Sequence, residues 1–192
     1  MAVLGAVLRN RRAGAAHLVW NLPNLAGPES LAVTSAAFGD GEAVPAAHAG
    51  KRAGGRNVSP QLAWSAPPEG TAQLLLVVED PDAPTRKPFV HCVALIDPAG
   101  LDGVLPEGAL AAAGAAAGVR ILRSGMGSGY LGPEPIRGHG PHHYVFQLFA
   151  LPEALTRTAG GAALERARPR AVAASVTGPV LARGRLTGVY ER

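Results

Sequence analysis

Cysteine is almost absent from this chain, and its single thiol, Cys92, excludes an intrachain disulfide and a cysteine-rich zinc site. One free cysteine agrees with a reducing compartment. No uninterrupted apolar run approaches the ~20 residues that a membrane-spanning helix requires. The first residues, MAVLGAVLRNRR, place their arginines after the apolar run, whereas a signal peptide places positive charge before it. We therefore expect a cytoplasmic protein with no integral membrane segment.

Lysine and aromatic residues are also scarce. The chain has 2 lysines against 16 arginines, and aromatic side chains make up 5% of its 192 residues. A net charge of +4 would allow contact with nucleic acid, but the arginines are dispersed in small groups with few aromatic neighbours. Dispersed charges usually indicate a solvated surface. The composition therefore predicts no nucleic-acid partner.

The length of the chain suffices for one domain with a proper core. Residues 1–30 differ from the rest, because apolar residues at helical spacing are followed there by a proline-punctuated stretch. We predict an N-terminal arm with a short helix over residues 1–30 and a single domain over residues 31–192. The arm is expected to pack on its own domain, and a partner subunit is the alternative recipient.

Short apolar runs separated by turn residues dominate the rest of the chain, which is the pattern of β structure. Helical pieces are predicted near residues 153–158 or 162–168, and another helix is predicted to start at Pro169. An alanine and glycine tract at residues 108–118 could form one further helical stretch. Together these features predict an all-β sandwich with minor helices. Strands are expected at residues 31–38, 74–80, 89–96, 144–151 and 186–190, with one more ending at Trp64.

Residues 74–96, LLLVVEDPDAPTRKPFVHCVALI, combine two apolar runs with a polar loop between them. Side chains of a strand alternate between its two faces, so His91 is predicted to share a face with Val93 and Leu95, and Cys92 to lie opposite. Asp80 ends the first run. The turn between the strands should bring Asp80 and His91 close together.

Residues 138–146, GHGPHHYVF, lead into another strand. Alternation places His142, Tyr144 and Phe146 on one face and His143 on the other. His139 is expected in a flexible loop. The glycine-rich residues 124–135 match neither a phosphate-binding P-loop nor a dinucleotide fingerprint, so we interpret them as a loop.

These segments resemble the phosphatidylethanolamine-binding protein family, also called the Raf-kinase-inhibitor-like family, in its bacterial branch. The resemblance rests on DPDAP, FVHCV and GHGPHHYVF, with support from NVSPQLAW, YLGPEP and the ending LTGVYER. It covers the chain from residue 31 to the C-terminus. It implies a mainly β fold, a sandwich of two antiparallel sheets with a few short helices and long loops. It also implies a small pocket that binds anions such as phosphate or phosphorylated lipid head groups.

By that resemblance, two groups of residues would form the pocket. The position of Phe89 is a tryptophan in many relatives, and His143 stands where arginine is common. Residues 120–129 lack the Asn-Asp-Phe-Gly signature of the family. The implied anion-binding residues are Asp80, Asp82, His91, Gly140, His142 and Tyr144, and the implied walls are Pro84, Phe89 and Pro141.

The residue types suit an anionic ligand. Imidazoles can donate hydrogen bonds to phosphate oxygens, and a carboxylate such as Asp80 can accept a proton or orient a histidine. A metal site is disfavoured, because His142 and His143 cannot both face inward from one strand. We therefore expect no metal and no cofactor.

We expect non-enzymatic binding of a small anionic ligand, with modulation of a kinase or protease and assembly into a homodimer as the resemblance implies. One alternative is a hydrolase acting on a phosphoester or acyl substrate. The sequence has no Gly-x-Ser-x-Gly elbow, and nothing indicates activation of Ser59 or Ser128. No catalytic residue is therefore assigned. The other alternative is a module that docks a phosphorylated side chain.

Overall fold

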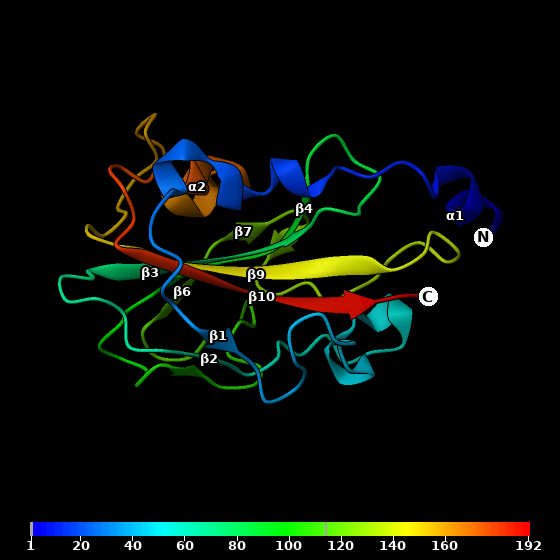
Figure 1. Cartoon of the computed structure of the whole chain (residues 1–192), viewed down its shortest axis with the longest axis horizontal. Coiled ribbons are helices and arrows are strands. Elements are labelled where there is room, and N and C mark those ends of the chain that lie inside the picture. Colours follow the sequence, from blue (N-terminus) through cyan, green and yellow to red (C-terminus); the bar gives the residue numbers. More distant parts are fainter. Residues whose placement is uncertain (1, 114) are drawn as a thin grey trace.

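A five-stranded antiparallel sheet forms the centre of the computed structural model, which describes residues 2–113 and 115–192 (Figure 1). The order of its strands is β10-β9-β3-β4-β6. The longest strand, β9, therefore lies beside the hairpin of β3 and β4 that the sequence predicted, and β10 pairs with the other edge of β9. The strands are β3 (Gln73–Asp80), β4 (Phe89–Ile96), β6 (Val119–Ile121), β9 (His142–Leu151) and β10 (Ala182–Tyr190).

A smaller sheet packs against one face of the central sheet. It contains β1 (Val33–Thr34), β2 (Leu62–Trp64) and β5 (Val104–Leu105) in the order β1-β2-β5, all antiparallel. The apolar side chains between the two sheets form the sheet-to-sheet core, which includes Leu76 and Phe146. The predicted sandwich of two antiparallel sheets is confirmed. A further ribbon joins β7 (Arg123–Ser124) and β8 (Gly127–Ser128).

Short helices cover the opposite face of the central sheet (Figure 1). This helix-side core includes Leu25, Val77 and Phe149. Because β3 is covered on both faces, every residue from Leu74 to Asp80 is buried, which explains an apolar run without polar alternation. The helices are α1 (Ala2–Leu8), α2 (Pro169–Ala173) and six 3₁₀ turns: Ala15–His17, Val19–Asn21, Pro23–Leu25, Ala46–His48, Lys51–Ala53 and Leu164–Arg166.

The N-terminal segment lies against the helix-covered face of the central sheet of its own chain. Trp20 packs on Phe149 with ring centroids 5.7 Å apart, and the guanidinium of Arg183 lies 4.1 Å from the Trp20 ring. The amide of Val19 donates a hydrogen bond to the buried Glu79 carboxylate at 2.7 Å. Among the described residues, no helix is long and apolar enough to cross a membrane.

Two secondary-structure predictions were wrong. The strand expected at residues 31–38 covers only Val33–Thr34, because Ser35 and Ala36 then bond to the backbone and side chain of Gln61 instead of continuing a ladder. The tract at residues 108–118 forms turns, although residue 114 lies outside the described residues. Gly108 has a φ of 81° there, a conformation that interrupts a helix.

A β-bulge in β4 sets the direction of His91. Val78 pairs with Cys92, whereas the next residue, Glu79, pairs with Val90. His91 is therefore the extra residue of the bulge. Bulges of this kind bend a strand and change the aim of a side chain.

The bulge corrects the predicted alternation in β4. Val93 and Leu95 belong to the helix-side core, but His91 packs edge-on against Tyr144, which belongs to the sheet-to-sheet core. Cys92 lies in that same sheet-to-sheet core rather than on the face opposite His91. The predicted alternation of β9 is confirmed, since Tyr144, Phe146 and Leu148 share one face.

Candidate functional site

A cavity of about 630 Å³ opens where strand β3 ends and strands β4 and β9 begin. Six of the nine residues that the sequence predicted for the site line it, namely Asp80, Pro84, Phe89, His91, His142 and Tyr144. Asp82, Gly140 and Pro141 are not among its lining residues. The lining also includes residues from loops that the sequence analysis left out, such as Lys51, Arg52, Asn57, Leu131 and Glu134.

Asp80 organises the loop between β3 and β4 from a buried position. Its Oδ1 accepts hydrogen bonds from the amides of Asp82 at 2.8 Å and Ala83 at 3.0 Å. Its Oδ2 accepts a hydrogen bond from Nδ1 of His142 at 2.7 Å. Three donors thus surround the carboxylate, which offsets the charge that it would otherwise present to an anion.

His91 faces the cavity with one ring nitrogen already bonded. Its Nδ1 donates to the carbonyl of Leu131 at 2.6 Å. Burial lowers the pKa of His91 below its usual value, although the Asp80 carboxylate acts in the opposite direction. The imidazole is therefore neutral near pH 7, and its Nε2 is left as a hydrogen-bond acceptor. The ring stands edge-on to Tyr144 and Phe89, with centroids 5.0 Å away in both cases.

The hydroxyl of Tyr144 is the unsatisfied group of the cavity. Tyr144 is only 2% exposed, and its hydroxyl has no hydrogen-bond partner among the described residues. Burial, with a further contribution from the charge of Asp80, raises the pKa of the phenol well above its usual value. The group therefore keeps its proton. A buried hydroxyl without a partner costs free energy, so this donor is suited to an acceptor that enters the cavity.

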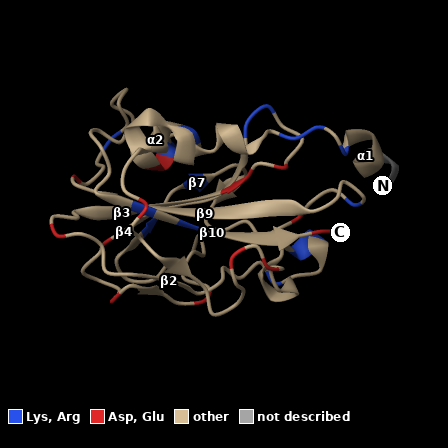
Figure 2. Ribbon diagram, viewed as in Figure 1, with Lys and Arg blue, Asp and Glu red and all other residues tan. Residues whose placement is uncertain are grey.

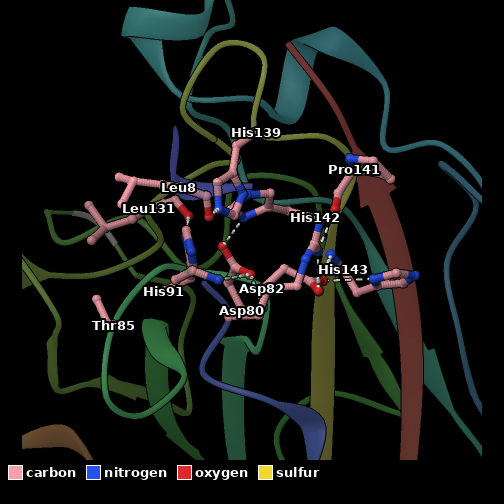
Figure 3. A network of polar contacts seen from close by, with 12 residues as sticks. Leu8, Asp80, Asp82, Thr85, His91, Leu131, His139, Pro141, His142 and His143 are labelled. Atoms are coloured by element: carbon pink, nitrogen blue, oxygen red, sulfur yellow. Dashed lines mark hydrogen bonds and ion pairs between the residues drawn. The ribbon is translucent and has the colours of Figure 1, made fainter. Parts of the chain in front are cut away.

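A row of polar groups links the cavity to the N-terminal segment (Figure 3). Nδ1 of His139 lies 2.7 Å from Nε2 of His142, whose Nδ1 binds Asp80. Nε2 of His139 donates to the carbonyls of Leu8 at 2.8 Å and Arg11 at 3.2 Å. His139 lies in the loop before β9, as expected, but its side chain is fully buried and bonded on both sides.

Asp82 ties the loop to the N-terminal segment outside the cavity. Arg12 forms an ion pair with Asp82 and also donates to the carbonyl of Pro141 at 3.0 Å. The amide and Nδ1 of His143 both donate to Asp82 at 2.7 Å. Burial acts to raise the pKa of Asp82, but the bonds from His143 and Arg12 outweigh it and hold the pKa below its usual value. Asp82 is thus a carboxylate at neutral pH.

Gly140 shapes the turn before β9. Its φ is 98°, which glycine adopts without strain, and a Cβ at this position would lie 3.4 Å from a guanidinium nitrogen of Arg12. The pocket residues predicted from the motif thus divide into two groups. One group lines the cavity, and the other holds the N-terminal segment beside it.

Residues on two loops complete the cavity rim. Exposed Lys51 and Arg52 add positive charge, and the amide of Arg52 donates to the carboxylate of Glu134 at 2.8 Å. Asn57, at a φ of 58°, donates to the carbonyl of Tyr130 and accepts from the amide of Gly132. Asn57 therefore fixes the loop whose Leu131 carbonyl holds His91.

Comparisons with known proteins show which family the chain belongs to. The family model described as "Phosphatidylethanolamine-binding protein" matches residues 34–191. The UPF0098 protein Rv1910c of Mycobacterium tuberculosis is 38% identical over 181 residues, which cover 92% of this chain and 78% of that protein. LppC, a candidate lipoprotein of the same species, is 38% identical over 165 residues, which cover 85% of this chain and 73% of that protein.

Solved structures share the fold. Escherichia coli YbcL, described as a member of the mammalian PEBP family, is 31% identical with a TM-score of 0.70, and the match covers 84% of this chain and 98% of YbcL. CT736 of Chlamydia trachomatis, a candidate PEBP homologue, is 26% identical with a TM-score of 0.69, covering 85% and 99% of the two chains. The resemblance found in the sequence motifs is confirmed. The chain belongs to the phosphatidylethanolamine-binding protein family.

Proposed function

We propose that the chain binds a small anionic compound, a phosphate or a phosphorylated head group, in the cavity lined by Asp80, His91 and Tyr144, without covalent chemistry. The observation that carries the proposal is the buried Tyr144 hydroxyl, which lines the cavity and has no partner among the described residues. A phosphate oxygen that accepts this hydrogen bond would satisfy it. The exposed cations Lys51 and Arg52 at the rim favour entry of an anion.

His91 gives the site its second contact with the ligand. A neutral imidazole whose Nδ1 is bonded to Leu131 offers Nε2 as an acceptor. A phosphate monoester has a second pKa of about 6, so its monoanion brings a P–OH proton that Nε2 can accept. A fully ionised oxyanion would instead draw a proton onto His91. Both routes give a complex in which one proton is shared between the imidazole and the ligand.

The lining favours binding over hydrolysis. It contains no serine or cysteine among the described residues, and the hydroxyl of its Thr85 donates to the carbonyl of Lys87. Burial raises the pKa of the Cys92 thiol to about 12, so this side chain is not a nucleophile at neutral pH. The Oγ of Ser59 accepts a hydrogen bond from the amide of Leu110, away from the cavity.

Calorimetric titration with inorganic phosphate and phosphoethanolamine tests the proposal. The wild type should bind both, and Tyr144→Phe should weaken binding about tenfold or more, because a hydrogen bond to a charged group is worth about 1.5–3 kcal/mol. Tyr190→Phe is the matched control, since its hydroxyl does not line the cavity. Absence of binding by the wild type, or equal affinities for Tyr144→Phe and wild type, would refute the assignment. Turnover of a phosphoester or ester panel would favour the hydrolase instead.

A further inference from the structure

A second cavity, of about 520 Å³, lies next to the first and shares Pro84 and Thr85 with it. We call it the basic groove. Its other walls are residues 10–13 and His17 of the N-terminal segment and Arg86 of the β3–β4 loop. Most of the groove thus comes from residues outside the part of the chain that the family model matches, which begins at residue 34.

The groove concentrates positive charge. Its lining contains the guanidinium groups of Arg11, Arg12 and Arg86 and the imidazole of His17, and no carboxylate among the described residues. Arg12 is already paired with Asp82. Arg11 and Arg86 are exposed, and neither forms an ion pair within the described part of the chain. Figure 2 shows basic residues along both the N-terminal segment and the β3–β4 loop, the two walls of this groove.

Backbone hydrogen bonds hold the two walls together. The amide of Ala13 donates to the carbonyl of Ala83 at 3.0 Å, and the amide of Gly14 donates to the carbonyl of Pro81 at 2.8 Å. Gly14 has a φ of 90°, so a side chain at this position would strain the turn. On the far side, His139 holds the carbonyl of Leu8. The groove is therefore formed before any ligand arrives, which lowers the entropic cost of binding.

We propose that the basic groove binds a second anionic group of the ligand whose first anionic group occupies the neighbouring cavity. The ligand class is a small molecule with two phosphate groups joined by a short linker. Guanidinium groups suit phosphate because they donate two parallel hydrogen bonds to its oxygens. Among the described residues that line the groove, His17 is the one with an aromatic ring, so the groove offers little for stacking a nucleic-acid base. This inference rests on the function proposed for the first cavity.

A series of alkane-1,n-bisphosphates, compared with methyl phosphate by calorimetry, tests the inference. In the wild type, the bisphosphate with the best spacer should bind about tenfold or more tightly than methyl phosphate, since a second set of charge-assisted hydrogen bonds is added. The double variant Arg11→Gln/Arg86→Gln should lose this gain and keep its affinity for methyl phosphate. Arg86→Glu alone should weaken bisphosphate binding further than Arg86→Gln alone.

The control variant Arg157→Gln/Arg166→Gln removes the same charge from exposed positions outside both cavities, and it should retain the gain. Equal bisphosphate affinity in the wild type and in Arg11→Gln/Arg86→Gln would overturn the inference, as would an equal loss in the control. Either result leaves the proposed function intact if methyl phosphate still binds. If bisphosphate binding depends on Arg11 and Arg86 but methyl phosphate does not bind, the basic groove still binds phosphate. Anion binding in the first cavity, the proposed function, is then refuted. A wild type that binds neither compound refutes both.

Discussion

Asp80 and His142 form a buried pair, in which Nδ1 of His142 donates to Oδ2 of Asp80 at 2.7 Å. The pair joins the end of β3 to the start of β9, two neighbouring strands of the central sheet. The same carboxylate holds the amides of Asp82 and Ala83. One aspartate therefore fixes the loop, the cavity wall and, through His142 and His139, the N-terminal segment.

Asp80→Asn should lower the stability of the fold. An asparagine side chain has one acceptor oxygen, so it cannot accept both from the two loop amides and from His142, and one buried donor loses its partner. We expect the free energy of unfolding in urea to fall by about 2 kcal/mol. Asp97→Asn, an exposed control that accepts one local amide hydrogen bond, should change it by less than about 0.5 kcal/mol. Equal effects of the two substitutions would contradict the organising role of Asp80.

Anion affinity should rise as the pH falls. Burial lowers the pKa of His91 in the free protein, and an adjacent anion favours the imidazolium, so the complex binds more protons than the free protein. By linkage, affinity should increase by up to about tenfold for each pH unit between pH 8 and 6. Sulfate is the informative probe because it does not titrate in this range. Calorimetry in buffers of different ionisation enthalpy should show proton uptake, which His91→Gln should abolish.

Much of the fold, and most of the residues that line the cavity from the ends of its strands, could be predicted from the sequence for physical reasons. Strands buried on both faces must be continuously apolar, which made β3 and β4 recognisable. One short motif ends β3 at Asp80, and another begins β9 with His142 and Tyr144, so the resemblance placed these residues together. The structure confirms the sandwich, and these three residues line one cavity.

The remaining features have no local signal. The bulge at His91 depends on how β4 pairs with β3, and no residue of the continuously apolar β4 marks its position in the sequence. The contacts of Arg12 with Asp82 and of His139 with Leu8 join residues far apart in the chain, without periodicity or motif. The motif GHGPHH did contain His139, but alternation alone could not show that a residue before the strand turns back toward it.

His139→Leu should loosen the N-terminal segment. The substitution removes the donor to the carbonyl of Leu8 and leaves the packing volume of the ring partly filled. Amide hydrogen exchange at residues 11–14 should accelerate about tenfold, which corresponds to the loss of one net hydrogen bond. Amides in the centre of β9 should keep their rates. His17→Leu is the control, because that side chain is exposed, and acceleration of the same size in the control would contradict the link through His139.

Arg170→Met should destabilise the protein in a pH-dependent manner. Glu79 is completely buried on β3 and forms an ion pair with Arg170, while the amides of Val19 and Gln147 donate to its other oxygen. Burial already raises the pKa of Glu79, and removal of Arg170 leaves its charge without a partner. Breaking a buried pair in this way costs about 3 kcal/mol.

The sign of the pH effect follows from the proton balance of Glu79. A carboxyl whose pKa is raised by folding binds more protons in the native than in the unfolded state, so the stability it contributes declines as the pH rises through that range. Without Arg170 the pKa of Glu79 rises further, and the deficit of Arg170→Met should be larger at pH 8 than at pH 5. Urea unfolding at both pH values measures the difference. Arg123→Met is the control, because among the described residues the guanidinium of Arg123 donates to the carbonyl of Arg166 alone, and its effect should be small and pH-independent. A deficit of the same size at both pH values in Arg170→Met would contradict a further rise in the pKa of Glu79.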